Sequence, residues 1–202
     1  MKKVLLVTDG VFHPPLLAVW GLHRTLEAVD GLTFKHVRSL ESLPFDLVDY
    51  AAVVLYFHHK TISETALERL ENFVSRGGGV LGVHSATASF KQEPRYFTIL
   101  GGRFTGHGAV EDFEVRHCGD EGVFSIGQAF KIYDELYFHE MSPDIQVQYV
   151  TVQEGQEVPL VWTFAYGAGR VCYAMPGHTV RSMRHPAVQE ILQTGLKWVS
   201  GV

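Results

Sequence analysis

Histidine is the residue type in this sequence with the widest chemical use. The chain has 11 histidines in 202 residues. Those that fall at predicted strand ends or in glycine-rich and polar segments are His13, His58, His59, His84, His107, His139 and His178. Imidazole binds divalent metals and also titrates near neutral pH. The group therefore predicts either a site for a borderline ion such as zinc or a proton-transfer site, and the spacing does not choose between them.

Carboxylates and aromatic residues accompany these histidines. Asp9 lies beside His13 after the first predicted strand, and Glu135 lies in the polar segment 134–139. Asp134 and Glu135 could supply an acid, a base or a ligand, and a solvated turn is the alternative for both. Tyr137 and Trp162 could pack against the apolar faces of a sugar, and core packing is the alternative for each. His23 and His36 are interpreted as ordinary, one in a helix and one on a short strand.

The first half of the chain alternates strands and helices. Apolar, β-branched runs predict strands at 3–8, 32–37, 50–57 and 79–84. A helix is predicted with Pro14 and Pro15 in its first turn, and another starts at a capping box formed by Thr61 and Glu64. This order favours a parallel sheet with helices on both faces. Ligands of such sheets bind at the carboxyl ends of the strands, where most of the histidines are expected.

The second half has a different pattern. Strands are predicted at 110–117, 145–152, 158–164 and 170–175, and a last helix begins near 185–186. The segment 158–175 is typical of an antiparallel hairpin, with its turn at 166–169. Residues 1–202 are therefore expected to form one α/β domain with an antiparallel extension.

Composition excludes several classes of function. The formal net charge is −5 and no basic run is present, so a nucleic-acid partner is not expected. The longest apolar run, 51–57, is far shorter than the roughly 20 residues of a membrane helix, and Asp9 ends the N-terminal apolar stretch too early for a signal peptide. We expect a cytoplasmic protein without a membrane partner.

Cofactor and cysteine motifs are equally informative. Cys118 and Cys172 are far apart and lack CxxC spacing, which argues against a disulfide framework or a thiolate zinc site. Neither GxGxxG nor GxxxxGK[ST] occurs, so no nucleotide cofactor is expected.

Several motifs resemble one known family. They are GGGVLGVHSA at 77–86, LGGRFTGH at 100–107, DELY at 134–137, PLVW at 159–162, YGAGRV at 166–171 and GH at 177–178. In this order they are similar to the ThuA-like (trehalose utilisation) family across nearly the whole chain. The resemblance implies a single ThuA-like domain with the class I glutamine amidotransferase-like fold, a flavodoxin-like three-layer α/β sandwich, and an association with carbohydrate metabolism.

The resemblance also indicates which chemistry is absent. In the amidotransferases a strand ending in Gly-x-Cys presents a nucleophilic thiolate on a sharp strand-to-helix turn. Here that place is taken by Gly82-Val83-His84, so glutamine amidotransfer is excluded. Ser85 follows, but the GxSxG pattern of serine nucleophiles is missing. His178 matches the position of the amidotransferase triad histidine, and we expect it to face His84 across the cleft.

These observations lead to a first hypothesis of an enzyme that acts on a sugar or an oxidised sugar derivative, with histidine acid–base or metal-assisted chemistry. His84, His178 and Glu135 are the expected catalytic residues. The expected substrate-binding residues are Asp9, His13, His58, His59, His107, Tyr137, His139 and Trp162. A divalent metal such as zinc would be held by His84, His107, His139 and His178. The alternatives are a non-catalytic sugar-binding or partner-binding module and a structural subunit, and a homo-oligomer is favoured.

Overall fold

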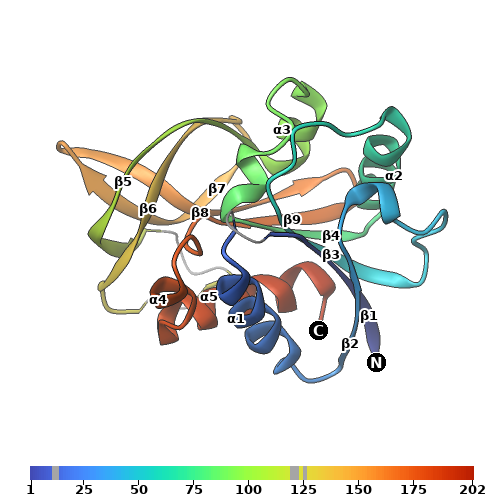
Figure 1. Cartoon of the computed structure of the whole chain (residues 1–202), viewed down its shortest axis with the longest axis horizontal. Helices are drawn as coiled ribbons and strands as arrows, with labels where there is room; N and C mark the ends of the chain where they lie inside the picture. Colours follow the sequence, from blue (N-terminus) through green and yellow to red (C-terminus); the bar gives the residue numbers. More distant parts are fainter. Residues whose placement is uncertain (11–13, 119–122, 125–126) are drawn as a thin grey trace.

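The computed structural model describes residues 1–10, 14–118, 123–124 and 127–202. Within them a mixed sheet of nine strands has the order β2-β1-β3-β4-β9-β8-β7-β5-β6 (Figure 1). The strands are β1 (Lys2–Thr8), β2 (Leu32–Val37), β3 (Tyr50–Tyr56), β4 (Gly79–Val83), β5 (Gly102–His117), β6 (Phe130–Met141), β7 (Gln146–Gln153), β8 (Gln156–Tyr166) and β9 (Gly169–Ala174).

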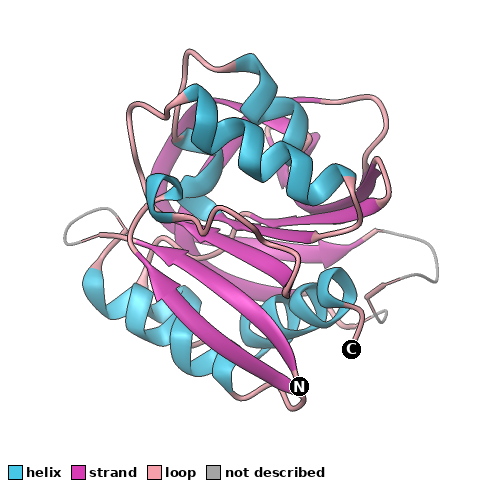
Figure 2. Cartoon of the chain, turned by 90° about the vertical axis from the view of Figure 1, so that its right-hand side faces the viewer, coloured by secondary structure: helices cyan, strands magenta, loops and turns pink. Residues whose placement is uncertain are grey.

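Helices cover both faces of the parallel part of the sheet. They are α1 (Leu16–Glu27), α2 (Glu64–Ser75), α3 (Pro94–Leu100), α4 (Val180–Met183) and α5 (Pro186–Ser200), with 3₁₀ turns η1 (Leu40–Ser42) and η2 (His84–Ala88). Figure 2 shows the helices in two groups with the strands between them, and Figure 1 places α2 and α3 on one side and α1, α4 and α5 on the other. Among the described residues, no helix has the length and apolar character needed to cross a membrane.

The apolar runs explain the centre of the sheet. Strands β2, β1, β3 and β4 pair in parallel, as the alternation of strands and helices in the first half predicts. Strand β9, from the second half, pairs in parallel with β4 and extends this part of the sheet. Val4–Val7 of β1 and Ala52–Tyr56 of β3 have no exposed surface, because helices cover both faces. Strands β9, β8, β7, β5 and β6 pair antiparallel and form the extension.

The predicted hairpin is confirmed in β8 and β9. These strands pair antiparallel from Val161 with Ala174 to Tyr166 with Gly169. The turn contains Gly167, whose φ of 59° lies in the left-handed region that glycine adopts readily.

The structure differs from the sequence analysis at four places. Helix α1 begins at Leu16 with Pro15 as its N-cap, so Pro14 and Pro15 precede its first turn. Helix α2 is capped by Ser63, whose Oγ accepts from the Ala66 N–H, and not by Thr61, since the chain becomes helical only at Glu64. Helix α3 was not predicted. The segment around Glu135 is the interior of the 12-residue strand β6 and not a solvated turn, because β5 pairs with it along most of its length.

Close backbone packing leaves no room for a side chain at Gly169, beside the turn of the hairpin. A Cβ atom on Gly169 would lie 2.0 Å from the Val74 carbonyl oxygen and 2.4 Å from that of Gly78. Backbone atoms cannot turn aside as a flexible side chain can. We expect Gly169→Ala to lower the free energy of unfolding by about 1–3 kcal/mol or more, measured by urea denaturation.

The matched control is Gly106→Ala in β5, where an added Cβ meets no atom within 4 Å. Its midpoint of denaturation should stay close to that of the wild type. Equal midpoints for the two variants would contradict the packing argument.

Candidate active site at the carboxyl edge of the sheet

The parallel pairing of β4 with β9 brings two distant histidines together. Val83 and Ala174 are register partners at the carboxyl ends of these strands, and His84 and His178 follow them. His84 Nε2 lies 3.2 Å from His178 Nδ1. The expectation that the two imidazoles face each other is confirmed.

His84 occupies a strained turn. It is the first residue of η2, it is fully buried, and its φ is 40°. Such a conformation costs a residue with a Cβ about 1–2 kcal/mol. Two contacts hold it: the His84 carbonyl accepts a hydrogen bond from the Tyr173 hydroxyl at 2.8 Å, and its Nδ1–H donates to the Met175 carbonyl at 2.9 Å. With Nδ1 protonated, neutral His84 carries its lone pair on Nε2, the nitrogen that faces His178.

Glu135 reaches the two histidines from the antiparallel extension. Its Oε2 lies 3.2 Å from His178 Nδ1 and 3.7 Å from His84 Nε2, while Oε1 lies 3.0 Å from His107 Nδ1. Only 11% of the Glu135 side chain is exposed. Three imidazoles therefore surround one carboxylate.

The surroundings of Glu135 favour its charged form. Burial alone raises the pKa of a carboxyl group, but the neighbouring imidazoles of His84, His178 and His107 outweigh it and hold the pKa of Glu135 below its usual value. Burial and the proximity of His84 lower the pKa of His178, against the opposing pull of Glu135 and Asp134. These surroundings therefore favour an ionised Glu135 carboxylate beside a neutral His178 imidazole.

Asp134 positions the loop that carries His178. This fully buried carboxylate accepts from the backbone N–H groups of Glu135 (3.0 Å), Gly177 (2.7 Å) and Thr179 (3.0 Å). The Tyr56 hydroxyl donates to the Gly177 carbonyl at 2.6 Å and holds the same loop from β3. Sequence reasoning named Asp134 only as an acid beside Glu135. Its role depends on a contact 43 residues along the chain, which local patterns do not contain.

The group formed by His84, Glu135 and His178 has the spacing of a metal site. Its ligand atoms lie 3.2, 3.2 and 3.7 Å apart. In a tetrahedral zinc site with bonds of about 2.0–2.2 Å, ligand atoms are about 3.3–3.6 Å apart. The hydrogen bond from His84 Nδ1 to the Met175 carbonyl is the type of contact that orients metal-binding histidines. The residues therefore fit a divalent ion of the zinc class.

This group differs from the expected set of four histidines. His139 lies on the same face of β6 as Glu135, but four residues along a strand span about 13 Å. Its Nε2 is 2.9 Å from the Thr87 hydroxyl, and burial followed by the charge of His84 lowers its pKa to about 3. His107 contacts the far oxygen of Glu135 from β5, next to breaks in the β5–β6 register. Such irregularities commonly redirect side chains near sites.

The predicted aromatic residues lie beneath the site. Tyr137 packs on His84 with a centroid distance of 4.1 Å and is 2% exposed. Trp162 is fully buried and donates its Nε1–H to the Leu100 carbonyl. Neither leaves an aromatic face free for a sugar, so the core-packing alternative describes them better. Phe104 is half-buried beside Tyr137 and lies under the Lys91 ammonium, at 4.8 Å.

A second polar group lies at the same edge, after β1 and β3. Asp9 Oδ2 is 3.1 Å from His59 Nε2, and its other oxygen is 3.4 Å from Arg38. Burial and then the charge of Lys91 lower the pKa of His58. His13 lies outside the described residues.

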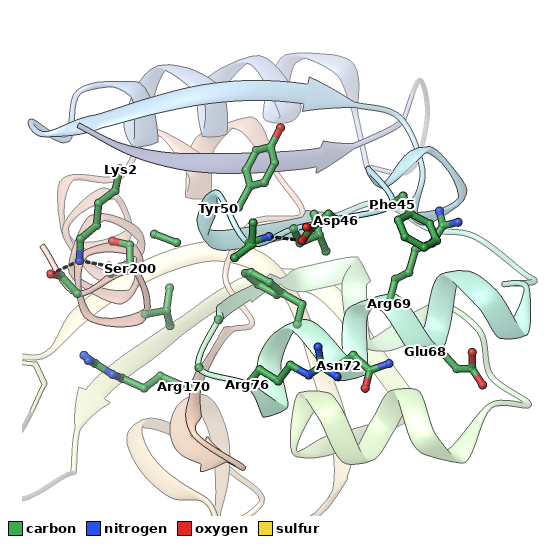
Figure 3. A pocket seen from close by; sticks show the side chains of 18 of the residues that line it. Lys2, Phe45, Asp46, Tyr50, Glu68, Arg69, Asn72, Arg76, Arg170 and Ser200 are labelled. Atoms are coloured by element: carbon green, nitrogen blue, oxygen red, sulfur yellow. Dashed lines mark hydrogen bonds between the residues drawn. The ribbon is translucent and has the colours of Figure 1, made fainter.

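The opposite edge of the sheet holds a hollow of about 870 Å³. Figure 3 shows Lys2, Arg170 and Ser200 around it. Lys2 Nζ donates to the carbonyls of Ser200 and Gly201, and Arg170 donates to that of Trp198. These cations satisfy the carboxyl end of α5, which is a structural role.

Comparisons with known proteins place this geometry in context. The family model described as ThuA, trehalose utilisation, matches residues 3–199. No curated protein matches the sequence. A solved structure described as a ThuA-like protein from Parabacteroides merdae has 21% identity and a TM-score of 0.84, covering 98% of this chain and 90% of that one.

Two other solved structures share the fold. A cytoplasmic protein from Salmonella typhimurium has 13% identity and a TM-score of 0.71, with 98% of this chain and 99% of that chain covered. A β-galactosidase from Bacillus circulans has 13% identity and a TM-score of 0.65, with 99% of this chain but 30% of the enzyme covered. At these identities the likeness is one of fold alone.

The role of Asp134 can be tested by removing one acceptor oxygen. In Asp134→Asn an amide NH₂ would face backbone N–H groups that now donate to the carboxylate. We expect the free energy of unfolding to fall by about 1–3 kcal/mol, the usual cost of a buried group left without its hydrogen bond. Urea denaturation measures it, with the exposed Asp144→Asn as the control. If both variants unfold at the wild-type midpoint, Asp134 does not anchor this loop.

Proposed function

Because this chain belongs to the ThuA (trehalose utilisation) family, we propose that it is an enzyme of carbohydrate metabolism that acts on a sugar or an oxidised sugar derivative. The observation that carries the proposal is the convergence of His84 Nε2, His178 Nδ1 and Glu135 Oε2 within 3.7 Å of one another. The strand order β2-β1-β3-β4-β9 of the parallel part supports the flavodoxin-like sandwich that the family resemblance implies.

His178 and Glu135 are suited to proton transfer. With 21% of its side chain exposed, His178 is the most accessible of the three groups, against 11% for Glu135 and none for His84. When no cation is bound at Nδ1, a lowered pKa leaves its imidazole able to accept a proton from a substrate hydroxyl or from a carbon next to a carbonyl. Glu135 lies 3.2 Å from His178 Nδ1 and would then stabilise the imidazolium that forms.

His84 supplies an Nε2 lone pair with a fixed orientation. Its Nδ1–H is committed to the Met175 carbonyl, so Nε2 keeps its orientation toward Glu135 and His178. We propose that these three residues hold a divalent cation of the zinc class. When bound, such a cation supplies Lewis-acid polarisation of a substrate carbonyl or hydroxyl group.

Surrounding residues offer contacts suited to a sugar. Phe104 is half-buried and stacks near His107, with a centroid distance of 6.2 Å, so it offers an apolar surface beside polar groups. His107, His58, His59 and Asp9 are proposed to contact ligand hydroxyls. Glutamine amidotransfer does not fit, because position 84 carries no thiol and burial raises the pKa of the Cys172 thiol.

Metal content is the first test. Protein purified without an affinity tag and dialysed should contain a divalent transition metal. His84→Ala and His178→Ala should contain about one equivalent per chain less than the wild type, whereas His117→Ala, a half-buried histidine on β5, should keep the wild-type content. Elemental analysis measures the content. An unchanged metal content in His84→Ala and His178→Ala would contradict the proposed ligands.

Turnover is the second test. Incubation with sugars and oxidised sugars, followed by chromatography and mass spectrometry, should identify a substrate. His178→Ala should then lower kcat about 10²–10⁴-fold, the usual contribution of a general acid or base, with His117→Ala close to the wild type. A ligand that binds without being converted would point instead to the alternative of a non-catalytic binding module.

A further inference from the structure

We propose that His23, Glu27 and His36 form a second binding site for a divalent transition metal, separate from the group around Glu135. His23 and Glu27 belong to α1, whereas His36 belongs to β2, at the edge of the sheet. Each residue offers one ligand atom, and these atoms all lie within 4.8 Å of one another.

The secondary structure explains why the three side chains meet. His23 and Glu27 are four residues apart in α1 and so lie on the same side of the helix, one turn apart. His36 is the register partner of Leu6 on the neighbouring strand β1. Glu27 Oε1 lies 3.1 Å from His36 Nε2, and the rings of His23 and His36 are 4.4 Å apart.

An ordinary ion pair does not account for this arrangement. The His36 and Glu27 side chains are 42% and 46% exposed, and an exposed pair of this kind contributes little to stability. The ion pair also does not involve the His23 ring, whereas a cation bound by both rings and the carboxylate would use all three side chains.

His23 is prepared for such binding. Its Nε2 lies 2.9 Å from the Thr8 hydroxyl, a contact that orients the ring as the outer contacts of metal-binding histidines do.

The donor set indicates the class of ion. Two imidazoles and one carboxylate suit zinc and its neighbours Co²⁺, Ni²⁺ and Cu²⁺, whereas Ca²⁺ and Mg²⁺ prefer sites made of oxygen atoms. Three protein ligands leave a further position open. A bound ion would also join α1 to the edge strand β2 and stabilise the folded chain.

Zinc titration by isothermal calorimetry tests the site on chelator-treated, desalted protein. The His178→Ala variant lacks a ligand of the first group. It should therefore show one zinc-binding event, at the site formed by His23, Glu27 and His36. Adding His36→Ala should lower the zinc affinity of this site by about 100-fold or more. Loss of an outer-shell partner costs up to about 100-fold, and loss of a direct ligand should cost at least as much. Glu27→Gln should weaken it in the same direction. The matched control is Lys35→Ala, an exposed neighbour of His36 on β2, which should bind as its parent does.

The two proposals fail in different ways. If His36→Ala and Lys35→Ala bind zinc with the same stoichiometry and affinity in this background, the second site does not exist. Circular dichroism will check that both variants are folded, which is expected because both side chains are exposed. Failure of the first group would appear instead as unchanged zinc binding on going from wild type to His178→Ala.

Discussion

The parallel pairing of β4 with β9 is the contact on which the rest of the site depends. Val83 and Ala174 lie side by side at the carboxyl ends of these strands, so the residues that follow them leave the sheet at the same point. His84 then turns sharply with a φ of 40°, and His178 returns after Gly177, whose φ is 149°. Strain at His84 is tolerated because two hydrogen bonds hold the residue. The Tyr173 hydroxyl of β9 donates to the His84 carbonyl, and the Met175 carbonyl, just after β9, accepts from His84 Nδ1–H. A strained residue held by its surroundings is common at functional sites.

The neighbouring carboxylates of Asp134 and Glu135 have different roles. Asp134 is saturated by backbone N–H groups and joins β6 to the loop after β9, whereas Glu135 accepts from imidazoles and faces the site. Successive residues of a strand point to opposite faces, which explains how adjacent acids can have such different surroundings. The antiparallel extension therefore does more than widen the sheet, because it supplies the only carboxylate in the group of three that we assign to the site.

The two histidine–glutamate groups differ in how they are built. The first joins η2, β6 and the segment after β9, and its side chains are at most 21% exposed. The second joins α1 to β2 with two of its three members exposed. Burial gives the first group a water-poor environment in which charge interactions are stronger, as chemistry on a substrate requires. Exposure gives the second group easy access for an ion but little control over a reaction. These contrasts support a catalytic proposal for the first and a binding proposal for the second.

The parallel core and the edge at which His84 and His178 meet follow from patterns along the chain. Apolar runs such as 50–57 favour strands covered on both faces, and parallel strands end at a common edge. Which other groups join the two histidines depends on contacts between distant segments. The polar and aromatic residues of β6 did not identify a buried strand, because their burial comes from β5, the loop after β9 and Tyr137 packing on His84. Likewise, nothing local distinguishes Glu135 from His139, or joins His23 to His36. Those choices depend on strand register and on helix packing between residues far apart in the chain, and such contacts leave no periodic pattern in the sequence.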